Sequence, residues 1–172
     1  MKDHQDHRQA IIDACLAMNR EGINQGIAGN VSLRKGDDVL ITPSGVPYET
    51  MRRGDIVRMN LAGEHSGPNR PSSEWRMHLD IYRRHAEARA VVHAHPDYCT
   101  ALACLRRGIP PFHYMVAVAG GRDIRCSEYA TFGTEALSRE MLAALDGRRA
   151  CLLGNHGMIC YERDLDRALR LA

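Results

Sequence analysis

Lysine is almost absent from this sequence of 172 residues. Only Lys2 and Lys35 occur, whereas arginine accounts for the other 21 of the 23 basic residues. Lys2 lies in a polar N-terminal segment and Lys35 in a predicted hairpin turn, so neither suits a buried amine that forms an imine with a carbonyl substrate. The sequence therefore argues against covalent lysine chemistry.

The sequence also has no excess charge of one sign and no long apolar run. The formal net charge is +2 without a basic block, which argues against nucleic acid or an anionic membrane as a partner. Residues 1–5 are too polar for a secretory signal, and no apolar stretch approaches membrane-spanning length. The six cysteines form no C-x-x-C pair, and most lie in apolar runs. These absences predict a reduced, cytoplasmic protein.

The residues that are present suit one globular domain covering 1–172. The chain is 44% apolar and 26% charged, and a domain of this length buries about two-thirds of its unfolded surface. Short strands, several joined by hairpins, alternate with three or four helices, without a repeat or linker. The pattern predicts an α/β class, with helices on both faces of a mixed or mainly antiparallel sheet.

Periodicity and turn residues place the individual elements. The predicted strands cover residues 31–34, 39–42, 55–61, 91–95, 112–119, 151–153 and 158–161. The predicted helices are one that ends near Gly22, one that begins at Ser72 or Ser73, one that follows Pro96, one capped by Thr134, and one over 165–172. The last helix stops without a cap, which indicates that the natural chain continues.

Three histidines are candidate metal ligands. His93 and His95 are two residues apart on a predicted strand, so both side chains point to one face. His156 lies in a glycine-flanked turn, and Glu74, in the first turn of its predicted helix, could supply a fourth ligand. Nitrogen ligands with one labile carboxylate are more typical of a catalytic zinc site than of a structural one, which usually contains thiolates. The alternatives are a structural His-x-His pair, a plain hairpin loop and helix-dipole compensation by Glu74.

The other six histidines have no such spacing, and we expect them to be structural or exposed. They are His4, His7, His65, His78, His85 and His113.

Three segments combine glycine amides with hydroxyl groups and could form an anion pocket without lysine. They are Gly29-Asn30, Thr42-Pro43-Ser44-Gly45 and Ser72-Ser73. Each alone is more typical of a cap or turn. Together, and next to Glu74, they indicate a phosphate site beside a metal.

The order and spacing of these motifs resemble the class II aldolase/adducin family. The motifs are Gly29-Asn30-Val31-Ser32, Thr42-Pro43-Ser44-Gly45, Pro71-Ser72-Ser73-Glu74, His93-Ala94-His95 and Asn155-His156-Gly157. Further segments resemble its L-fuculose-1-phosphate aldolase subgroup: Asn24-Gln25-Gly26, Ser72-Ser73-Glu74-Trp75-Arg76, His113-Tyr114-Met115 and 129–134. The resemblance covers essentially the whole chain.

The resemblance implies a three-layer αβα domain with a largely antiparallel sheet, in a homotetramer with active sites between subunits. It implies that His93, His95 and His156 bind Zn²⁺, and that Glu74 both ligates zinc and serves as acid/base. It assigns the substrate phosphate to Gly29, Asn30, Ser44, Gly45, Ser72 and Ser73. It places Tyr114 and Phe132 on the aldehyde side, reached from a neighbouring subunit, and it implies a C-terminal tail beyond Ala172 that adds a tyrosine. The loop Glu64–Arg70 matches no role.

The implied activity is reversible cleavage of L-fuculose 1-phosphate, or a similar ketose 1-phosphate, to dihydroxyacetone phosphate and an aldehyde such as L-lactaldehyde. The scarcity of lysine independently favours a metal over an imine as the electron sink. Alternatives on the same site are a 5-deoxyribulose- or methylthioribulose-phosphate aldolase and a sugar-phosphate epimerase or dehydratase. A metal-free, adducin-like interaction module is a rival from another class, and the retained histidine triad argues against it.

Overall fold

The computed structural model describes residues 2–172, and for residues 2–4 the backbone alone. Its centre is a seven-stranded sheet in the order β4-β3-β2-β1-β5-β7-β6. The strands are β1 (Asn30–Lys35), β2 (Asp38–Ile41), β3 (Val57–Asn60), β4 (His65–Ser66), β5 (Ala90–Ala94), β6 (Ala150–Leu153) and β7 (Gly157–Glu162). Every pairing between these strands is antiparallel, which confirms the predicted sheet type.

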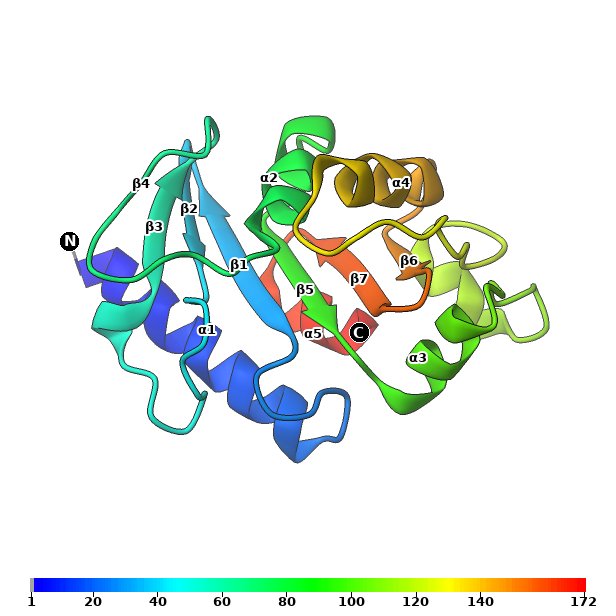
Figure 1. Ribbon diagram of the computed structural model, residues 1–172, viewed down its shortest axis with the longest axis horizontal. Coiled ribbons are helices and arrows are strands. Elements are labelled where there is room, and N and C mark those ends of the chain that lie inside the picture. The colour runs from blue at the N-terminus through cyan, green and yellow to red at the C-terminus, as the bar shows by residue number, and fades with distance from the viewer. Residues whose placement is uncertain (1) are drawn as a thin grey trace.

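Helices cover both faces of the sheet, so the predicted three-layer architecture is confirmed (Figure 1). The helices are α1 (Lys2–Arg20), α2 (Trp75–Arg84), α3 (Asp97–Cys104), α4 (Glu135–Leu145) and α5 (Leu165–Leu171), with short 3₁₀ segments η1 (Arg53–Asp55) and η2 (Tyr114–Ala119). Helices α2 and α4 pack together over one face, whereas α1 and α5 pack over the other.

Two apolar cores follow from the alternation of side chains along the strands. On β5, Val91 belongs to the core beneath α2 and α4, and Val92 belongs to the core beneath α1 and α5. Leu79 and Met141 are fully buried in the first core. Burial of each such side chain contributes about 1.5–3 kcal/mol, so the sheet and its helices hold one another in place.

Several local predictions are confirmed. Thr134 caps α4, because its Oγ1 accepts a hydrogen bond from the Leu137 backbone N–H at 3.2 Å. Gly36 has φ of +62° in the β1–β2 hairpin, a conformation that glycine adopts at little cost. Lys35 is exposed at the end of β1, as predicted.

The strand predicted over 112–119 is wrong. The chain there forms η2, in which the Val116 N–H donates to the His113 carbonyl at 3.1 Å, and Gly120 ends the segment with φ of +94°. Only Val116 and Ala119 are buried. An apolar run becomes a strand only when a neighbouring strand pairs with its backbone, and no strand of residues 2–172 pairs with this segment.

Several helix and strand boundaries also differ from the prediction, and His95, predicted on a strand, lies one residue beyond the end of β5. Helix α2 begins at Trp75, with Glu74 as its N-cap residue, rather than at Ser72 or Ser73. Strand β3 begins at Val57, because η1 occupies the preceding residues.

All six cysteines are free thiols. Within residues 2–172, no helix is both long and apolar enough to cross a membrane.

Candidate active site

Strand β5 positions the first two candidate ligands. His93 lies two residues after Val91 and therefore on the same face of the sheet, beneath α2. It is fully buried, and its Nδ1 lies 2.8 Å from the carbonyl oxygen of Met158 on β7. A carbonyl can only accept, so Nδ1 donates this hydrogen bond and Nε2 is the ring nitrogen turned toward Glu74 and His95. His95 follows directly after β5, with its Nε2 2.9 Å from His93 Nε2.

The third candidate ligand lies in the turn between β6 and β7. Asn155 has φ of +56°, which turns the chain so that His156 meets the other two rings. Ligand atoms of His93, His95 and His156 all lie within 4.8 Å of one another, so the predicted triad is brought together. Among residues 5–172, whose side chains the structure describes, it is the one cluster of three or more such side chains with this geometry.

Gly157 allows this close approach of β7 to the end of β5. A Cβ at this position would lie 2.6 Å from the Ala94 carbonyl oxygen and 2.9 Å from Cδ2 of His95. Any larger residue would therefore push the backbone or the imidazole of His95 aside. Gly157, the residue after His156, is therefore needed for the position of His95 as well as for the turn.

Glu74 joins the histidines from the N-terminus of α2. Its Oε2 lies 3.1 Å from His93 Nε2, and its Oε1 lies 3.1 Å from His156 Nε2. Burial by itself would raise the pKa of Glu74, but His93 and His156 outweigh burial and hold the pKa well below its usual range. The pKa of His95 is lowered to about 4, mainly by burial. The arrangement is therefore an ionised carboxylate facing imidazole nitrogens.

The donor set fits a divalent cation. Three imidazoles with one carboxylate are a ligand set of catalytic zinc sites, in which the fourth position is exchangeable. Oε1 of Glu74 is buried and faces Nε2 of His156, itself a candidate ligand, at 3.1 Å, so a cation held by His156 would meet this oxygen. The predicted metal site is thus supported by the geometry, and the three histidines are its core.

Asn30 holds the other oxygen of the carboxylate. Its Nδ2 donates to Glu74 Oε2 at 2.9 Å, and its Oδ1 lies 2.5 Å from Nε2 of His78. Both Asn30 and His78 are buried, and burial lowers the pKa of His78 to about 3. The resemblance assigns Asn30 to the substrate phosphate, and His78 was expected to be structural or exposed, so the contacts of Asn30 with Glu74 and His78 were not predicted.

The three predicted phosphate segments are neighbours in the fold. The Thr42 N–H donates to the Val31 carbonyl at 3.1 Å, and the Ser72 N–H donates to the Thr42 carbonyl at 2.9 Å. Gly29 is buried, whereas Ser44, Gly45 and Ser73 are exposed. Ser72 is buried, and its Oγ accepts from the Glu74 N–H at 3.3 Å. Their role in binding phosphate stays a prediction.

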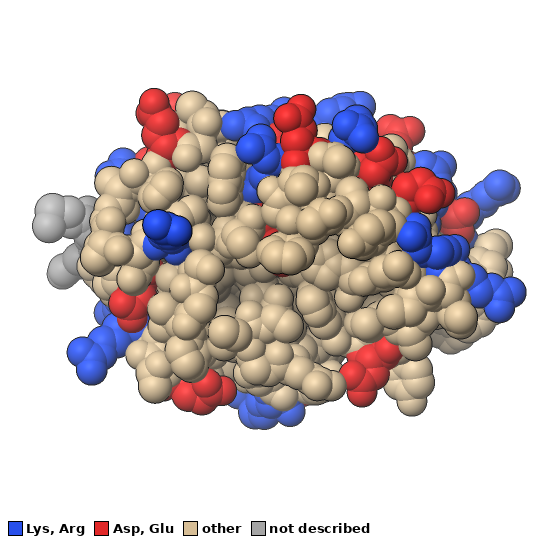
Figure 2. All heavy atoms as spheres, viewed as in Figure 1, with Lys and Arg blue, Asp and Glu red and all other residues tan. Residues whose placement is uncertain are grey.

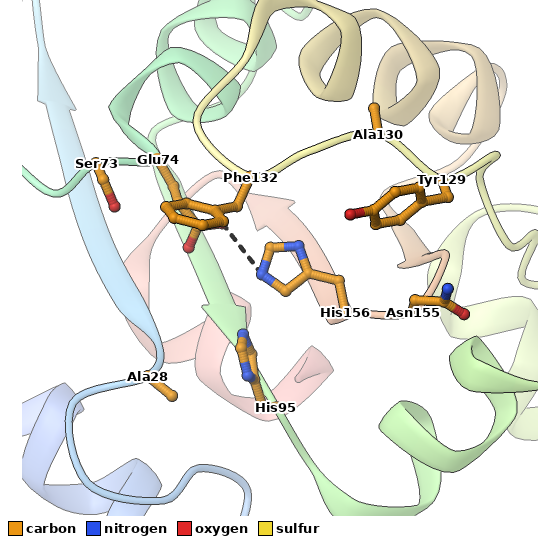
Figure 3. A pocket seen from close by; sticks show the side chains of 9 residues that line it. All are labelled: Ala28, Ser73, Glu74, His95, Tyr129, Ala130, Phe132, Asn155 and His156. Carbon is orange, nitrogen blue, oxygen red and sulfur yellow. Dashed lines mark ion pairs between the residues drawn. The ribbon is translucent and has the colours of Figure 1, made fainter.

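A cavity of about 380 Å³ opens beside these groups. It is lined by Ala28, Ser73, Glu74, His95, Tyr129, Ala130, Phe132, Asn155 and His156. Figure 3 shows Ser73 and Glu74 on one side, Tyr129 and Asn155 on the other, and His156 between them. In Figure 2 charged side chains gather toward the rim of this face, and few lie at its middle. The cavity therefore combines a hydroxyl end, an ionic centre and an aromatic end.

Two predicted site residues have different outcomes. Phe132 lines this cavity within its own chain, with 63% of its surface exposed. Tyr114 lies on η2 with 79% of its surface exposed, and it is not among the residues that line the cavity. A contribution of Tyr114 to catalysis thus needs a second chain and stays a prediction.

Tyr129 and Asn155 line the cavity but were not predicted as site residues. Arg106 holds both: its guanidinium lies 5.5 Å from the centre of the Tyr129 ring, and its Nε donates to Asn155 Oδ1 at 3.1 Å. No motif links positions so far apart in sequence. The position of Asn155 directly before a ligand was the available signal.

The other histidines are mostly as expected. His65 and His113 are exposed, and His85 is half-buried and stacks on Tyr161. The side chain of His4 lies outside the described residues. None belongs to the triad, but His78 lies in a buried network that reaches Glu74.

Comparison with known proteins identifies the family of the chain. The family model described as the Class II Aldolase and Adducin N-terminal domain matches residues 9–172. Over 165 residues, the chain is 54% identical to a 5-methylthioribulose-1-phosphate/5-deoxyribulose-1-phosphate aldolase of Rhodospirillum rubrum, covering 96% of this chain and 75% of that protein. It is 51% identical over 162 residues to an L-fuculose phosphate aldolase of Escherichia coli K12, covering 94% and 75%.

A solved structure is similar over nearly the whole fold. The structure of an L-fuculose 1-phosphate aldolase superposes with a TM-score of 0.94 at 40% identity, covering 96% of this chain and 79% of that chain. The predicted resemblance is therefore confirmed in both sequence and fold.

Proposed function

Because the chain belongs to the class II aldolase and adducin family and is a metal-dependent carbon–carbon lyase, we propose that it cleaves a ketose 1-phosphate reversibly to dihydroxyacetone phosphate and a small aldehyde. The observation that carries the proposal is the set of three convergent histidines with a buried carboxylate in contact with two of them. An adducin-like interaction module has no need of this donor set.

His93, His95 and His156 would hold the cation, which we propose to be Zn²⁺, and Glu74 would complete its ligands in the resting state. When bound, the cation supplies Lewis-acid stabilisation of the negative charge that carbon–carbon cleavage leaves beside the carbonyl. The exposed Lys35 offers no buried amine that could act as the electron sink instead.

Glu74 would move the proton. Oε2 accepts a hydrogen bond from Asn30, whereas Oε1 contacts His156, a proposed metal ligand, and belongs to a carboxylate that lines the cavity. A general base needs a lone pair within reach of the substrate proton, and Oε1 is the oxygen that Asn30 does not occupy. Oε1 is therefore the oxygen that we assign to proton transfer at the carbon next to the carbonyl.

The substrate phosphate would lie at the Ser73 end. Backbone hydrogen bonds already place 42–44 beside 70–72, and glycine amides and hydroxyls can bind an anion without lysine. We propose Gly29, Asn30, Ser44, Gly45, Ser72 and Ser73 as the phosphate group, with the side chain of Asn30 shared with Glu74.

The aldehyde part would lie toward Phe132 and Tyr129. L-fuculose 1-phosphate is the substrate expected from the sequence. A second candidate, 5-deoxyribulose or 5-methylthioribulose 1-phosphate, is favoured by the 54% identity to the Rhodospirillum rubrum enzyme. All three substrates share the dihydroxyacetone phosphate half. L-fuculose 1-phosphate releases an aldehyde with a hydroxyl group, whereas the 5-deoxy and 5-methylthio substrates release aldehydes without one.

A homotetramer would bring Tyr114 of a neighbouring chain to the aldehyde oxygen, as a proton donor. Exposed apolar side chains surround it on the segment after α3: Phe112, Met115 and Val118 are each at least 45% exposed. Such a concentration of exposed apolar surface is typical of an interface. The cytoplasmic location and the single domain over 1–172 also stay predictions.

The test is a panel of ketose 1-phosphates assayed for release of dihydroxyacetone phosphate, with product analysis for epimers and dehydrated sugars. Release from L-fuculose 1-phosphate supports the first assignment, and release only from the 5-deoxy and 5-methylthio substrates supports the second. Epimerised or dehydrated products without carbon–carbon cleavage would contradict both. The metal-loaded protein with its His156→Ala variant as control separates enzymatic from background cleavage.

A further inference from the structure

A stripe of polar side chains runs along the buried face of α2, directly over β1. Glu74, His78 and Tyr82 follow one another at intervals of four residues and therefore share one side of the helix. All three side chains are buried, and Tyr82 and His78 are essentially inaccessible to solvent. Polar groups on the core side of a helix need partners, because an unsatisfied buried group costs about 1–3 kcal/mol.

Strand β1 supplies those partners at a matching spacing. Asn30 and Ser32 are two residues apart and are paired with His93 and Val91 of β5, so both face α2. Two residues of strand advance about 6.6 Å and four residues of helix about 6.0 Å, so the two series stay in step. The strand side chains therefore alternate with those of the helix.

The resulting contacts form an unbroken chain. Tyr82 Oη lies 2.7 Å from Ser32 Oγ, which lies 2.7 Å from His78 Nδ1. His78 Nε2 lies 2.5 Å from Asn30 Oδ1, and Asn30 Nδ2 lies 2.9 Å from Glu74 Oε2. We call this series, Tyr82–Ser32–His78–Asn30–Glu74, the buried relay.

The carboxylate at one end determines the direction of every hydrogen bond. Ionised Glu74 can only accept, so Asn30 presents its NH₂ to Glu74 and its carbonyl oxygen to His78. His78 must then donate from Nε2, which leaves Nδ1 of the neutral ring as an acceptor for the Ser32 hydroxyl. Ser32 in turn accepts from the Tyr82 hydroxyl. Each buried polar group has its partner, and a flip of any one member would set two donors against each other.

We propose that His78 is a positioning residue which, through Asn30, fixes Glu74 so that Oε2 is held and Oε1 is left for the metal and the substrate proton. This role rests on the proposed function. Its basis is that His78 is the donor to Asn30 Oδ1, so without His78 a buried carbonyl oxygen loses its partner and the Asn30 side chain loses one of the two contacts that hold it against Glu74. Hydrogen-bond partners behind metal ligands typically contribute about 10–100-fold to metal affinity or activity.

Three variants separate positioning from mere packing. His78→Phe keeps an aromatic ring but removes the donor to Asn30, whereas the amide of His78→Gln can replace the donor at the Nε2 position. Met77→Leu changes a buried side chain on the same helix without touching the relay and serves as the control. At saturating zinc, we expect His78→Phe to lower kcat about 10–100-fold with KM within about twofold, and His78→Gln to recover most of that loss.

Two further measurements do not need an active enzyme. Zinc affinity, from competition with a chromophoric chelator, should fall about tenfold in His78→Phe and recover in His78→Gln. Long-range ¹H–¹⁵N correlation spectra should show His78 neutral and protonated at Nε2. If the wild type releases no dihydroxyacetone phosphate, the proposed function fails while these two measurements still test the relay.

The proposal is overturned by an Nδ1-protonated or charged His78, or by a folded His78→Phe protein with the kcat and zinc affinity of the wild type. It is equally overturned if Met77→Leu loses as much activity as His78→Phe. If His78→Phe does not fold, Tyr82→Phe and Ser32→Ala remove single hydroxyl groups from the far end of the relay. Each should lower kcat several-fold without changing KM, and unchanged kcat in both would contradict the proposal.

Discussion

Replacement of Glu74 by glutamine tests the chemistry of the site with minimal change in shape. In the Glu74→Gln protein, the amide oxygen can still accept the Asn30 hydrogen bond now made to Oε2 at 2.9 Å. The NH₂ group then occupies the place of Oε1, which lies 3.1 Å from His156 Nε2. The substitution therefore leaves the support of the side chain intact and removes only its free lone pair and its charge.

The expected loss can be worked from these contacts. The three histidines remain, so most of the zinc should be retained, because the fourth position of a catalytic site is exchangeable. A missing general base costs about 10²–10⁴-fold, equivalent to about 3–5 kcal/mol of transition-state stabilisation. The loss should appear in kcat, because the phosphate group of residues is unchanged.

The assay is exchange of a carbon-bound proton of dihydroxyacetone phosphate with D₂O, followed by NMR without an aldehyde. The wild type should exchange the proton at the carbon that becomes the nucleophile, and Glu74→Gln should exchange it about 10²–10⁴-fold more slowly. Glu135→Gln, which changes an exposed carboxylate in the first turn of α4, is the matched control and should exchange normally.

The result that would refute this reasoning is near-normal exchange by a zinc-loaded Glu74→Gln protein. Another group, such as a water molecule or Tyr114 of a neighbouring chain, would then be the base. Loss of zinc together with exchange would instead show that Glu74 is an essential ligand and would contradict the assignment of an exchangeable fourth position.

Three further predictions concern the surroundings of the site. Gly157→Ala places a Cβ 2.9 Å from His95 Cδ2 and should weaken zinc binding, as measured by chelator competition, whereas Gly54→Ala, with no neighbouring atom within 4 Å, should not. Ser73→Ala should weaken binding of the phosphorylated substrate about tenfold or more, with little effect on the free sugar; equal effects on both would remove the anion site. Burial lowers the pKa of His78 from 6.5 to about 3, so between these values the unfolded chain binds more protons than the folded one. The free energy of unfolding of the metal-free protein should therefore rise with pH across this window, by up to about 1.4 kcal/mol per pH unit, and this contribution should be absent in His78→Phe.

The histidine triad could be predicted because each ligand depends on local geometry. A spacing of two residues on the predicted strand places His93 and His95 on one face, and although β5 ends at Ala94, their Nε2 atoms still lie 2.9 Å apart. His156 depends on a glycine-flanked turn, which is equally local. The sequence alone did not show that β5 and β7 are neighbours. Their antiparallel pairing brings His156 to the other two histidines.

The buried relay could not be predicted, because it depends on register between elements far apart in sequence. Asn30 and His78 meet only because β1 pairs with β5 in one register and α2 crosses above it. The four-residue spacing of Glu74, His78 and Tyr82 was visible in the sequence. Without a partner strand it was indistinguishable from an ordinary helix stripe that faces the core.

The segment 112–119 shows the opposite failure. Its apolar composition favours a strand, but no strand of residues 2–172 pairs with it, and it forms η2 with Tyr114 exposed. A sequence pattern indicates which side chains are apolar, but it does not show whether they are buried within their own chain or against another chain. We propose that a neighbouring copy of the chain covers this surface, and a single sequence does not contain that information.

The most direct test of the account is the metal dependence of carbon–carbon cleavage. The protein should be stripped with a chelator and assayed for release of dihydroxyacetone phosphate from L-fuculose, 5-deoxyribulose and 5-methylthioribulose 1-phosphates, before and after one equivalent of Zn²⁺ is added. We predict no cleavage by the stripped protein, recovery with zinc, and no recovery in His156→Ala. Full cleavage by the metal-free protein, or by zinc-treated His156→Ala, would contradict the assignment of the triad as the catalytic metal site.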